Sequence, residues 1–307
     1  MEDSPTIGFV GFGEAGYHLA KGLREAGIQE TCAYDVHTHT PGLGEKIRDR
    51  ARETGTRLLE SNTELARAAG MILSTVTANQ AAVAAGQTAP HLQGRHLYAD
   101  LNSVSPALKQ SIAETIASAG ARFVEVAVMA PVPPYNHRVP MLAGGAGARE
   151  FSDRLRPFGM NIEVVSTEVG TAAATKMFRS IMVKGMEALI TECVLGAGRY
   201  GADERVFASL KETFPGIDWG ALASYMVGRV VEHGERRARE MEEVAETLRS
   251  IGIKPIMAEA TVRRMDWSAE LGLKQYFGGR APKHYRELLD AVAEIENRQA
   301  VSETNSN

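Results

Sequence analysis

The chain has 307 residues, of which 44% are hydrophobic and 23% are charged, so it is long enough for two globular domains with large cores. Its formal net charge of −4 argues against a nucleic-acid-binding protein, which would carry a basic face. The sequence contains no apolar run long enough to span a bilayer, and we therefore expect no membrane association.

The N-terminus and the cysteines predict a cytoplasmic protein. Residues 1–5 are acidic, lead directly into an apolar run and do not resemble a signal peptide. The two cysteines, Cys32 and Cys193, fall in a predicted strand and a predicted helix. We expect both to be buried as small hydrophobic residues rather than to form a disulfide or a metal site.

Residues 6–16 carry the most informative pattern of the chain. The apolar run from Ile7 to Val10 leads into Gly11-Phe12-Gly13-Glu14-Ala15-Gly16, and an amphipathic helix follows. This arrangement fits the dinucleotide fingerprint G-x-G-x-x-G, in which the glycines make the tight turn, admit a pyrophosphate and allow close packing of the helix. The helix N-terminus then offers N–H groups to the phosphates. We predict that residues 11–16 bind a dinucleotide cofactor.

Strands and helices alternate through the first half of the chain. The predicted strands are Thr6–Val10, Thr31–Asp35, Arg57–Leu59, Met71–Thr75, His96–Leu101, Arg122–Val128, Val139–Ala143 and Ile162–Ser166. Such alternation is typical of a parallel, doubly wound sheet. No long helix separates the strands at 122–128 and 139–143, which predicts an antiparallel addition at one edge. We predict an N-terminal Rossmann domain over residues 1–168.

The pattern becomes helical after this point. The predicted helices are Thr171–Gly196, Phe207–Thr213, Trp219–Val227, Gly228–Ser250, Thr261–Glu270 and His284–Asn297. We predict an all-α domain over residues 169–307. Its apolar stripes, such as Val231, Ala238 and Met241, are more than a small bundle is expected to bury, which predicts a homodimer built on this half of the chain.

Polar residues follow three of the predicted parallel strands, where open α/β sheets bind ligands. Asp35 ends the second strand, and its carboxylate is suited to the ribose hydroxyls of NAD and repels the 2′-phosphate of NADP. His37 and His39 follow it, and they leave NADP as the alternative cofactor. Thr75 ends the strand at 71–75 and Val76 follows it, and Asn102 and Ser103 follow the strand at 96–101. We predict that these residues also contact the cofactor.

Lys176 is the predicted catalytic residue. It follows a run of small residues near the start of the helix at 171–196, where a cofactor can approach closely. A lysine shielded from water can exchange a proton with a substrate hydroxyl. Ser180 lies one turn further on the same face and is suited to bind a substrate oxygen. On the helix at 228–250, His233, Arg237 and Glu240 share one face, either as a solvated charged surface or as part of a ligand site.

The order of these parts resembles the β-hydroxyacid dehydrogenase superfamily, which includes 3-hydroxyisobutyrate and 6-phosphogluconate dehydrogenases. Residues 11–16 look like its glycine loop, and Asp100-Leu101-Asn102-Ser103-Val104-Ser105-Pro106 is similar to its D-x-S-T-x-x-P loop near the nicotinamide. Lys176 falls on the family lysine. The resemblance implies that Asn102, Lys176 and Ser180 act in catalysis, that Ser103 contacts the substrate, and that relatives pair through the helical domain.

This chain departs from the family pattern at the substrate. Met129-Ala130-Pro131 replaces the motif S-G-G, and Ser180 replaces an asparagine. The resemblance implies that residues 129–131 and Ser180 lie at the substrate site, and we predict the same for His233 and Arg237 from their shared helix face. The chain resembles a less-characterised branch related to the 6-phosphogluconate dehydrogenases. The nearby His137 and Arg138 are either ligands for an anionic substrate or part of an exposed loop.

Three functions are compatible with these features. The first is an NAD(P)-dependent dehydrogenase for a small hydroxy acid or related alcohol, with Lys176 as general acid and base and the cofactor bound between the two domains. The second is an imine reductase on the same scaffold, against which Lys176 argues because those enzymes usually lack the lysine. The third is a dinucleotide-binding protein without turnover.

Overall fold

The computed structural model describes residues 5–304, and their side chains as far as Arg298. It divides into two compact units, Met1–Lys176 and Met177–Asn307, whose division lies within one long helix. The sequence pattern had placed the domain boundary just before that helix, at residues 168 and 169. Within residues 5–304, no helix is both long and apolar enough to cross a membrane.

An eight-stranded sheet in the order β3-β2-β1-β4-β5-β6-β7-β8 forms the centre of the first unit. All neighbouring strands are parallel except β6 and β7, so the predicted antiparallel addition at one edge is confirmed. The strands are β1 (Ile7–Val10), β2 (Thr31–Tyr34), β3 (Arg57–Leu58), β4 (Met71–Ser74), β5 (Leu97–Asp100), β6 (Arg122–Val128), β7 (Met141–Gly144) and β8 (Ile162–Ser166).

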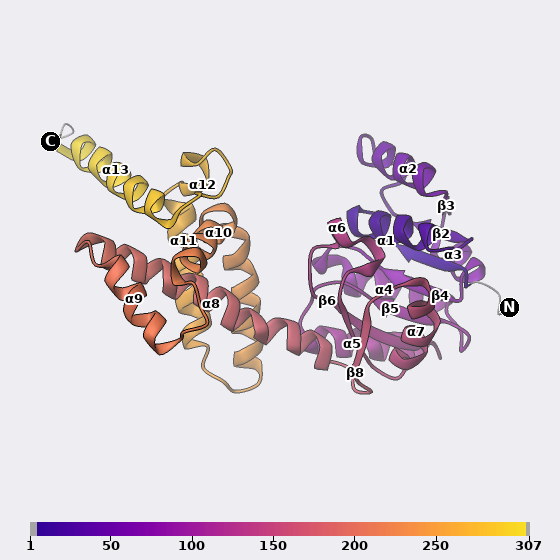
Figure 1. Cartoon of the computed structure of the whole chain (residues 1–307). Helices are drawn as coiled ribbons and strands as arrows, with labels where there is room; N and C mark the ends of the chain where they lie inside the picture. Colours follow the sequence, from indigo (N-terminus) through magenta and orange to yellow (C-terminus); the bar gives the residue numbers. More distant parts are fainter. Residues whose placement is uncertain (1–4, 305–307) are drawn as a thin grey trace. The chain divides into compact units, whose positions relative to one another are not determined.

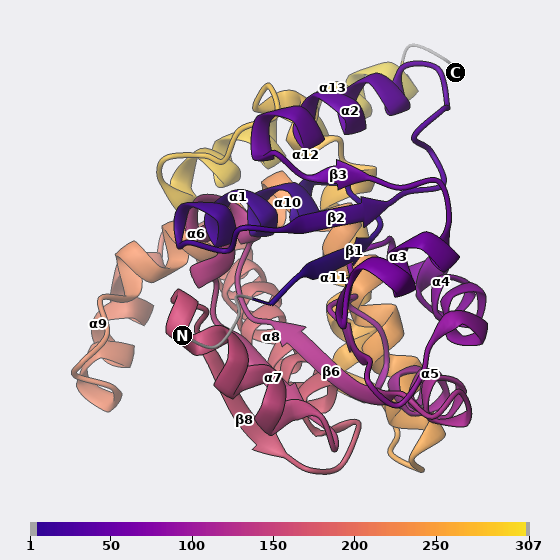
Figure 2. The same cartoon turned by 90° about the vertical axis from the view of Figure 1, so that its right-hand side faces the viewer.

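Helices cover both faces of this sheet, which gives the predicted Rossmann fold. The helices are α1 (Glu14–Glu25), α2 (Leu43–Thr54), α3 (Asn62–Ala68), α4 (Ala81–Thr88), α5 (Pro106–Ser118), α6 (Val132–Tyr135) and α7 (Ala148–Leu155), with short 3-10 turns η1 to η4 at Ala78–Gln80, Ala89–His91, Asn136–Arg138 and Arg156–Phe158. Side chains of α1, α2 and α7 join one buried cluster, and those of α3, α4 and α5 join another. Figures 1 and 2 show these helices arranged around the sheet.

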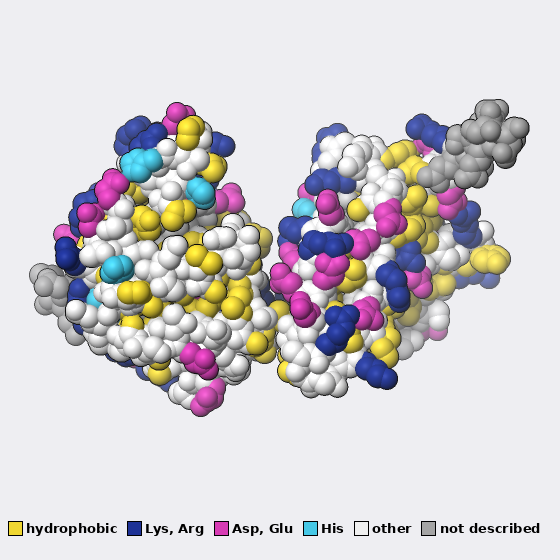
Figure 3. Space-filling view, turned by 180° about the vertical axis from the view of Figure 1, so that it is seen from behind, with side chains coloured by type: hydrophobic (Ala, Val, Ile, Leu, Met, Phe, Trp, Pro, Cys, Tyr) yellow, Lys and Arg dark blue, Asp and Glu magenta, His cyan; other side chains and the backbone are white. Residues whose placement is uncertain are grey.

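Among the described residues, the second unit consists of the part of α8 beyond Lys176 and five further helices. They are α8 (Thr171–Arg199), α9 (Asp203–Thr213), α10 (Trp219–Ser250), α11 (Ile256–Glu270), α12 (Leu273–Tyr276) and α13 (Tyr285–Thr304). One cluster packs α8 and α10 against α12 and α13, and a second packs them against α11. Acidic and basic side chains alternate on the face of this unit that Figure 3 shows.

Two expectations for the second unit are wrong. The predicted break between residues 227 and 228 does not exist, because α10 is one helix of 32 residues. Gly228 serves close packing instead, since a Cβ there would lie 3.1 Å from that of Ala281. The apolar stripes also need no partner chain: Val231, Ala238 and Met241 are buried against neighbouring helices of the same unit.

The cysteines differ from each other in burial. Cys32 is buried, and burial raises the pKa of its thiol to about 11. Cys193 is only partly buried, contrary to the expectation. Both thiols are free, so neither forms a disulfide.

Candidate functional site

One row of residues crosses the sheet through the last residues of β2, β1, β4 and β5 and through the middle of β6. Tyr34, Val10, Ser74, Asp100 and Glu125 are paired in succession across β2, β1, β4, β5 and β6. The loops that follow β2, β1, β4 and β5 therefore start at the same level. These loops contain the predicted cofactor residues of the first unit, so the sheet brings the sequence-predicted positions to one edge.

The glycines of residues 11–16 allow close packing against Thr75 on one side and leave open space on the other. Gly11 has a φ of 81°, and its N–H donates to Tyr34 O at 2.9 Å. A Cβ at Gly16 would lie 2.8 Å from Thr75 Oγ1, whereas a Cβ at Gly13 would meet no atom of the described residues within 4 Å. The space beside Gly13 and the N-terminus of α1 together fit the pyrophosphate of a dinucleotide. Phe12 contributes only its backbone, because its ring is buried in the core.

Asp35 links the glycine loop to the end of β2. Its Oδ2 accepts a hydrogen bond from Phe12 N at 2.7 Å, and its Oδ1 accepts one from His37 N at 2.9 Å. Each carboxylate oxygen keeps a further lone pair for a ribose hydroxyl. The sequence indicated the acidic residue, but only the structure places it on the backbone of the glycine loop.

The loop after β4 is joined to the glycine loop as well. Thr75 Oγ1 donates to Gly11 O at 2.7 Å, and Val76 lies so close that a Cβ at Gly11 would come within 2.7 Å of its Cγ1. The residues predicted from two separate motifs, Gly11 and Gly16 on one side and Thr75 and Val76 on the other, therefore form one continuous surface.

A buried polar network lies beneath the loop after β5. Asn102 is buried, and its Nδ2 donates to Asp100 Oδ1 and, at 2.9 Å, to Ser74 Oγ. Lys109 donates from α5 to the same Asp100 side chain. The amide nitrogen of Asn102 is thus used within the protein, which leaves its Oδ1 and the neighbouring Ser103, which is exposed, for a ligand. Ser105 caps α5 by accepting from Leu108 N at 3.3 Å, as predicted.

The start of α8 lies on this same side of the sheet. Glu125, in the cross-sheet row, accepts hydrogen bonds from three backbone N–H groups at residues 170–173. Gln110 of α5 donates to Val169 O at 3.2 Å, so the helix that follows Asn102 and Ser103 contacts the segment that leads into α8. Lys176 is the sixth residue of α8 and is partly buried, and Ser180 lies one turn further along.

The residues that follow β6, which are predicted to contact the substrate, differ from one another in burial. Met129 and Ala130 are partly buried beyond the end of β6, where Met129 N donates to Pro140 O at 2.8 Å, and Pro131 is exposed. His137 is not on an exposed loop, because it is buried against α1. A Cβ at Gly22 would lie 2.1 Å from His137 Nδ1, so the glycine makes room for the ring. Burial also lowers the pKa of His137.

The charged face of α10 is not simply solvated. Arg237 is buried and donates from Nη1 to both carboxylate oxygens of Glu187 on α8, at 2.7 and 2.8 Å. Lys184 of α8 pairs with Glu240 at 2.8 Å. The pKa of the half-buried His233 is lowered by burial and then by Arg229, whereas Glu232, whose Oε2 lies 3.6 Å from His233 Nε2, raises it. Lys184 continues the four-residue spacing of Lys176 and Ser180 and was recognisable in the sequence, whereas Glu187 was missed.

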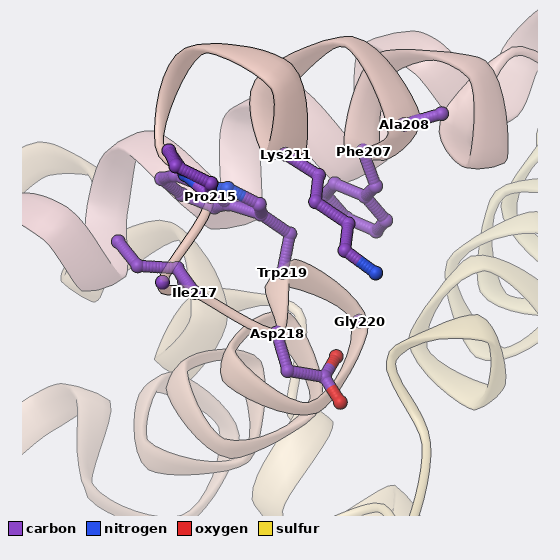
Figure 4. A pocket seen from close by; sticks show the side chains of 9 residues that line it. Phe207, Ala208, Lys211, Pro215, Ile217, Asp218, Trp219 and Gly220 are labelled. Carbon is purple, nitrogen blue, oxygen red and sulfur yellow. The ribbon is translucent and has the colours of Figure 1, made fainter.

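Two surface hollows lie in the second unit, away from all predicted site residues. One of about 430 Å³ is formed by α9, α10 and their connection, where Phe207, Lys211, Asp218 and Trp219 are among the lining residues (Figure 4). The other, of about 320 Å³, lies between α10 and α11 and is lined by Glu242, Arg249 and Glu259, among others. Neither contains a residue that the motifs single out.

Known protein families match parts of both units. Residues 6–158 match the NAD binding domain of 6-phosphogluconate dehydrogenase, and residues 197–268 match a domain of unknown function, DUF1932. A conserved hypothetical protein from Sinorhizobium meliloti 1021 is 39% identical, with 96% of this chain and 97% of that chain covered and a TM-score of 0.85. The conserved protein MTH1747, whose structure was described as similar to 3-hydroxyacid dehydrogenases, is 31% identical over 86% of this chain and 97% of its own, with a TM-score of 0.77.

The chain belongs to the β-hydroxyacid dehydrogenase superfamily. The mitochondrial 3-hydroxyisobutyrate dehydrogenase of Drosophila melanogaster is 26% identical over 221 residues, which are 70% of this chain and 65% of that protein. The match to the NAD binding domain and the 31% identity with MTH1747 confirm the resemblance, and the first unit is a domain of the NAD(P)-binding type.

Proposed function

We propose that this member of the superfamily is an NAD-dependent dehydrogenase that oxidises the hydroxyl group of a small hydroxy acid or a related alcohol. The observation that carries the proposal is the row from Tyr34 to Glu125. The same level of the sheet bears the glycine loop, Asp35, the Asn102 loop and the attachment of the helix that carries Lys176.

Different residues of the first unit would bind different parts of the cofactor. The N–H groups at the start of α1 and the space beside Gly13 would hold the pyrophosphate, and Asp35 would accept hydrogen bonds from the adenosine ribose. Thr75, Val76, Asn102 and Ser103 would line the path toward the nicotinamide. When bound, the cofactor supplies the acceptor for the hydride that leaves the substrate carbon.

Lys176 would accept the hydroxyl proton as the substrate C–H bond breaks, so that the alcohol becomes a carbonyl. Its neutral amine is the proton acceptor, and the resulting ammonium returns the proton to solvent or donates it in the reverse reaction. Ser180, one turn along α8, would hold the substrate oxygen, and Asn102 Oδ1 and Ser103 would face the same group.

The acidic group of the substrate requires positive partners, because the motif S-G-G is replaced by Met129-Ala130-Pro131. His233 and Arg237 are the proposed partners. After burial, Arg229, Arg236 and Arg237 lower the pKa of His233, whereas Glu232 raises it. The three guanidinium groups would attract a carboxylate placed on the side of the ring away from Glu232. Arg237 is already held by Glu187, which fixes its guanidinium in position.

We also propose a homodimer, on grounds other than the buried stripes. Met182 and Leu189 of α8 are exposed by 66% and 57%, and Tyr200, the residue that follows the helix, is exposed by 90%, although all three are large apolar or aromatic residues. The seven-residue spacing of Met182 and Leu189 places both on one face of α8, and Tyr200 extends the exposed surface beyond the end of the helix. A second copy of the chain, packed on this face, would remove them from water.

The experiment that tests the function is a screen of hydroxy acids and polyols with NAD and with NADP, in which the absorbance of the reduced nicotinamide is followed. We expect turnover with at least one hydroxy acid and a preference for NAD. Amine substrates are tested in parallel, because oxidation of amines without oxidation of alcohols would indicate the imine reductase chemistry instead. If NADH binds, as measured by its fluorescence, but no substrate turns over, the chain is a binding protein.

A further inference from the structure

A carboxylate lies fully buried in the middle of the sheet. Glu125 is the fourth residue of β6, its exposed fraction is 0%, and its neighbours along the strand are Val124 and Val126. A buried carboxylate is costly unless hydrogen bonds replace those it loses to water. The hydrogen-bond partners of Glu125 therefore indicate its role.

The partners of Glu125 are all at the beginning of α8. Oε1 accepts hydrogen bonds from Gly170 N at 2.7 Å and from Ala172 N at 3.0 Å, and Oε2 accepts one from Ala173 N at 3.2 Å. The N–H groups of a first helical turn have no partner within the helix, and a negative charge is favourable at this end. Glu125 thus caps the N-terminus of α8, although it lies 45 to 48 residues before the capped groups in the sequence.

The surrounding backbone is adapted to this cap. Gly144 of β7 is paired with Glu125, and a Cβ at Gly144 would lie 2.5 Å from Glu125 Oε1. Gly170 has a φ of 114°, which only glycine adopts readily, and this turn directs the chain into α8. The absence of a side chain at Gly144 therefore leaves the carboxylate room to reach the helix.

We propose that Glu125 is the positioning residue for Lys176. Ala173, the last partner of Glu125, precedes Lys176 by three residues, which is less than one helical turn. The cap thus sets the height and the rotation of the turn that carries the lysine relative to the cross-sheet row. This inference rests on the proposed function, because it assigns Glu125 a role only through the proton transfer at Lys176. Glu125 itself touches neither substrate nor cofactor.

The test compares Glu125→Gln with the unmodified protein. Glutamine has the same length, but it removes the charge and places an amide donor against N–H groups. Displacement of a reacting group by about 1 Å can cost on the order of 100-fold in rate. We expect kcat to fall about 10- to 100-fold, with KM and the Kd for NADH within about threefold, and faster hydrogen exchange at the amides of residues 170, 172 and 173.

A matched control separates positioning from general destabilisation. Asp203 is another buried carboxylate, which accepts hydrogen bonds from Tyr285 at 2.6 Å and from Arg286 within the second unit. Asp203→Asn is expected to lower Tm but to leave kcat and the exchange at residues 170–173 unchanged. If Glu125→Gln is folded and retains the kcat of the unmodified protein, the positioning role is overturned.

A substitution at Gly144 of β7 tests the same contact between Glu125 and α8. Gly144→Ala would push against Glu125 Oε1, and we expect it to lower kcat in the same way. Combined with Glu125→Asp, whose side chain is one carbon shorter, its effect should be less than the product of the two single effects, since both act on one contact. Independent, multiplicative effects would contradict the proposal.

The outcomes distinguish this inference from the proposed function. If the unmodified protein oxidises no alcohol, the proposed dehydrogenase function and the proposed role of Lys176 are both wrong. Turnover by the unmodified protein, together with unchanged kcat in Glu125→Gln, overturns only the positioning role. Lost kcat with unchanged exchange at residues 170–173 would also overturn it, because the loss would then arise elsewhere.

Discussion

Lys109 and Asp100 form an ion pair that is closed off from solvent. Nζ of Lys109 donates to Asp100 Oδ2 at 2.7 Å and to Asp100 O at 2.6 Å, and each side chain is 1% exposed. The pair joins the end of β5 to α5. It therefore holds both ends of the loop that contains Asn102 and Ser103.

Removal of one partner from this pair is expected to destabilise the first unit strongly. Lys109→Met leaves the Asp100 carboxylate buried without its cation, which typically costs about 3–5 kcal/mol in the free energy of unfolding. Urea unfolding measures this loss, and Asp100→Asn in the same chain should restore part of it. Arg52→Met, which breaks an exposed pair with Asp49, is the control. A loss for Lys109→Met as small as that of the control would show that the buried pair is not required.

Replacement of Lys176 is expected to abolish turnover but not cofactor binding. Loss of a general acid and base costs about 10²–10⁴ in rate. Lys176→Ala should therefore lower kcat by this factor, with the Kd for NADH within a few-fold. Lys211→Ala is the control, since Lys211 lines the hollow at α9 and α10. Near-normal kcat in Lys176→Ala on the substrate found by the screen would remove Lys176 from the mechanism.

The charge of Asp35 is expected to set the cofactor preference. Asp35→Asn keeps the size of the side chain and one acceptor for the backbone bonds, but it removes the repulsion of a 2′-phosphate. The ratio of kcat/KM with NAD to that with NADP should fall about tenfold, which corresponds to about 1.4 kcal/mol of discrimination. Asp49→Asn on α2 is the control. Equal or better kcat/KM with NADP in the unmodified protein would contradict the preference.

Acid is expected to destabilise the protein through His137. Burial is the main cause that lowers the pKa of His137 below its usual 6.5, and the neighbouring Arg138 adds to it. Below about pH 6.5 the unfolded chain therefore binds more protons than the folded chain, so the free energy of unfolding falls as the pH falls toward the folded pKa. His137→Gln should flatten this dependence in urea unfolding between pH 7 and 5. The exposed His91, replaced by Gln, serves as the control; the same slope in both variants would exclude His137 as a source.

The exposed face of α8 is expected to hold two chains together. Sedimentation at micromolar concentration should give twice the 33.1 kDa of one chain. Leu189→Glu places a charge in the middle of this face and should shift the mass toward that of one chain. Val83→Glu, at a 49% exposed position of α4, is the control. A mass of 33.1 kDa for the unmodified protein would rule out the dimer.

The sequence by itself determined the order and type of the elements. The bounds of β6, β8 and α5 agree with the predicted ones, because alternation, helical spacing and the Ser105-Pro106 start are local signals. The glycine loop, Asp35 and the lysine were recognisable for the same reason, and together they predicted the superfamily. The edge pairing of β6 and β7 also followed from the short connection between them.

Only the tertiary structure decided which polar groups meet. Glu125 and the start of α8 are 45 to 48 residues apart, Glu187 and Arg237 are 50 apart, and no local pattern marks either contact. Burial forces such groups to find partners, but the choice of partner depends on strand register and helix packing. For the same reason Gly228, which looks like a helix break in sequence, serves close packing, and the loop histidine at position 137 lies buried beside Gly22.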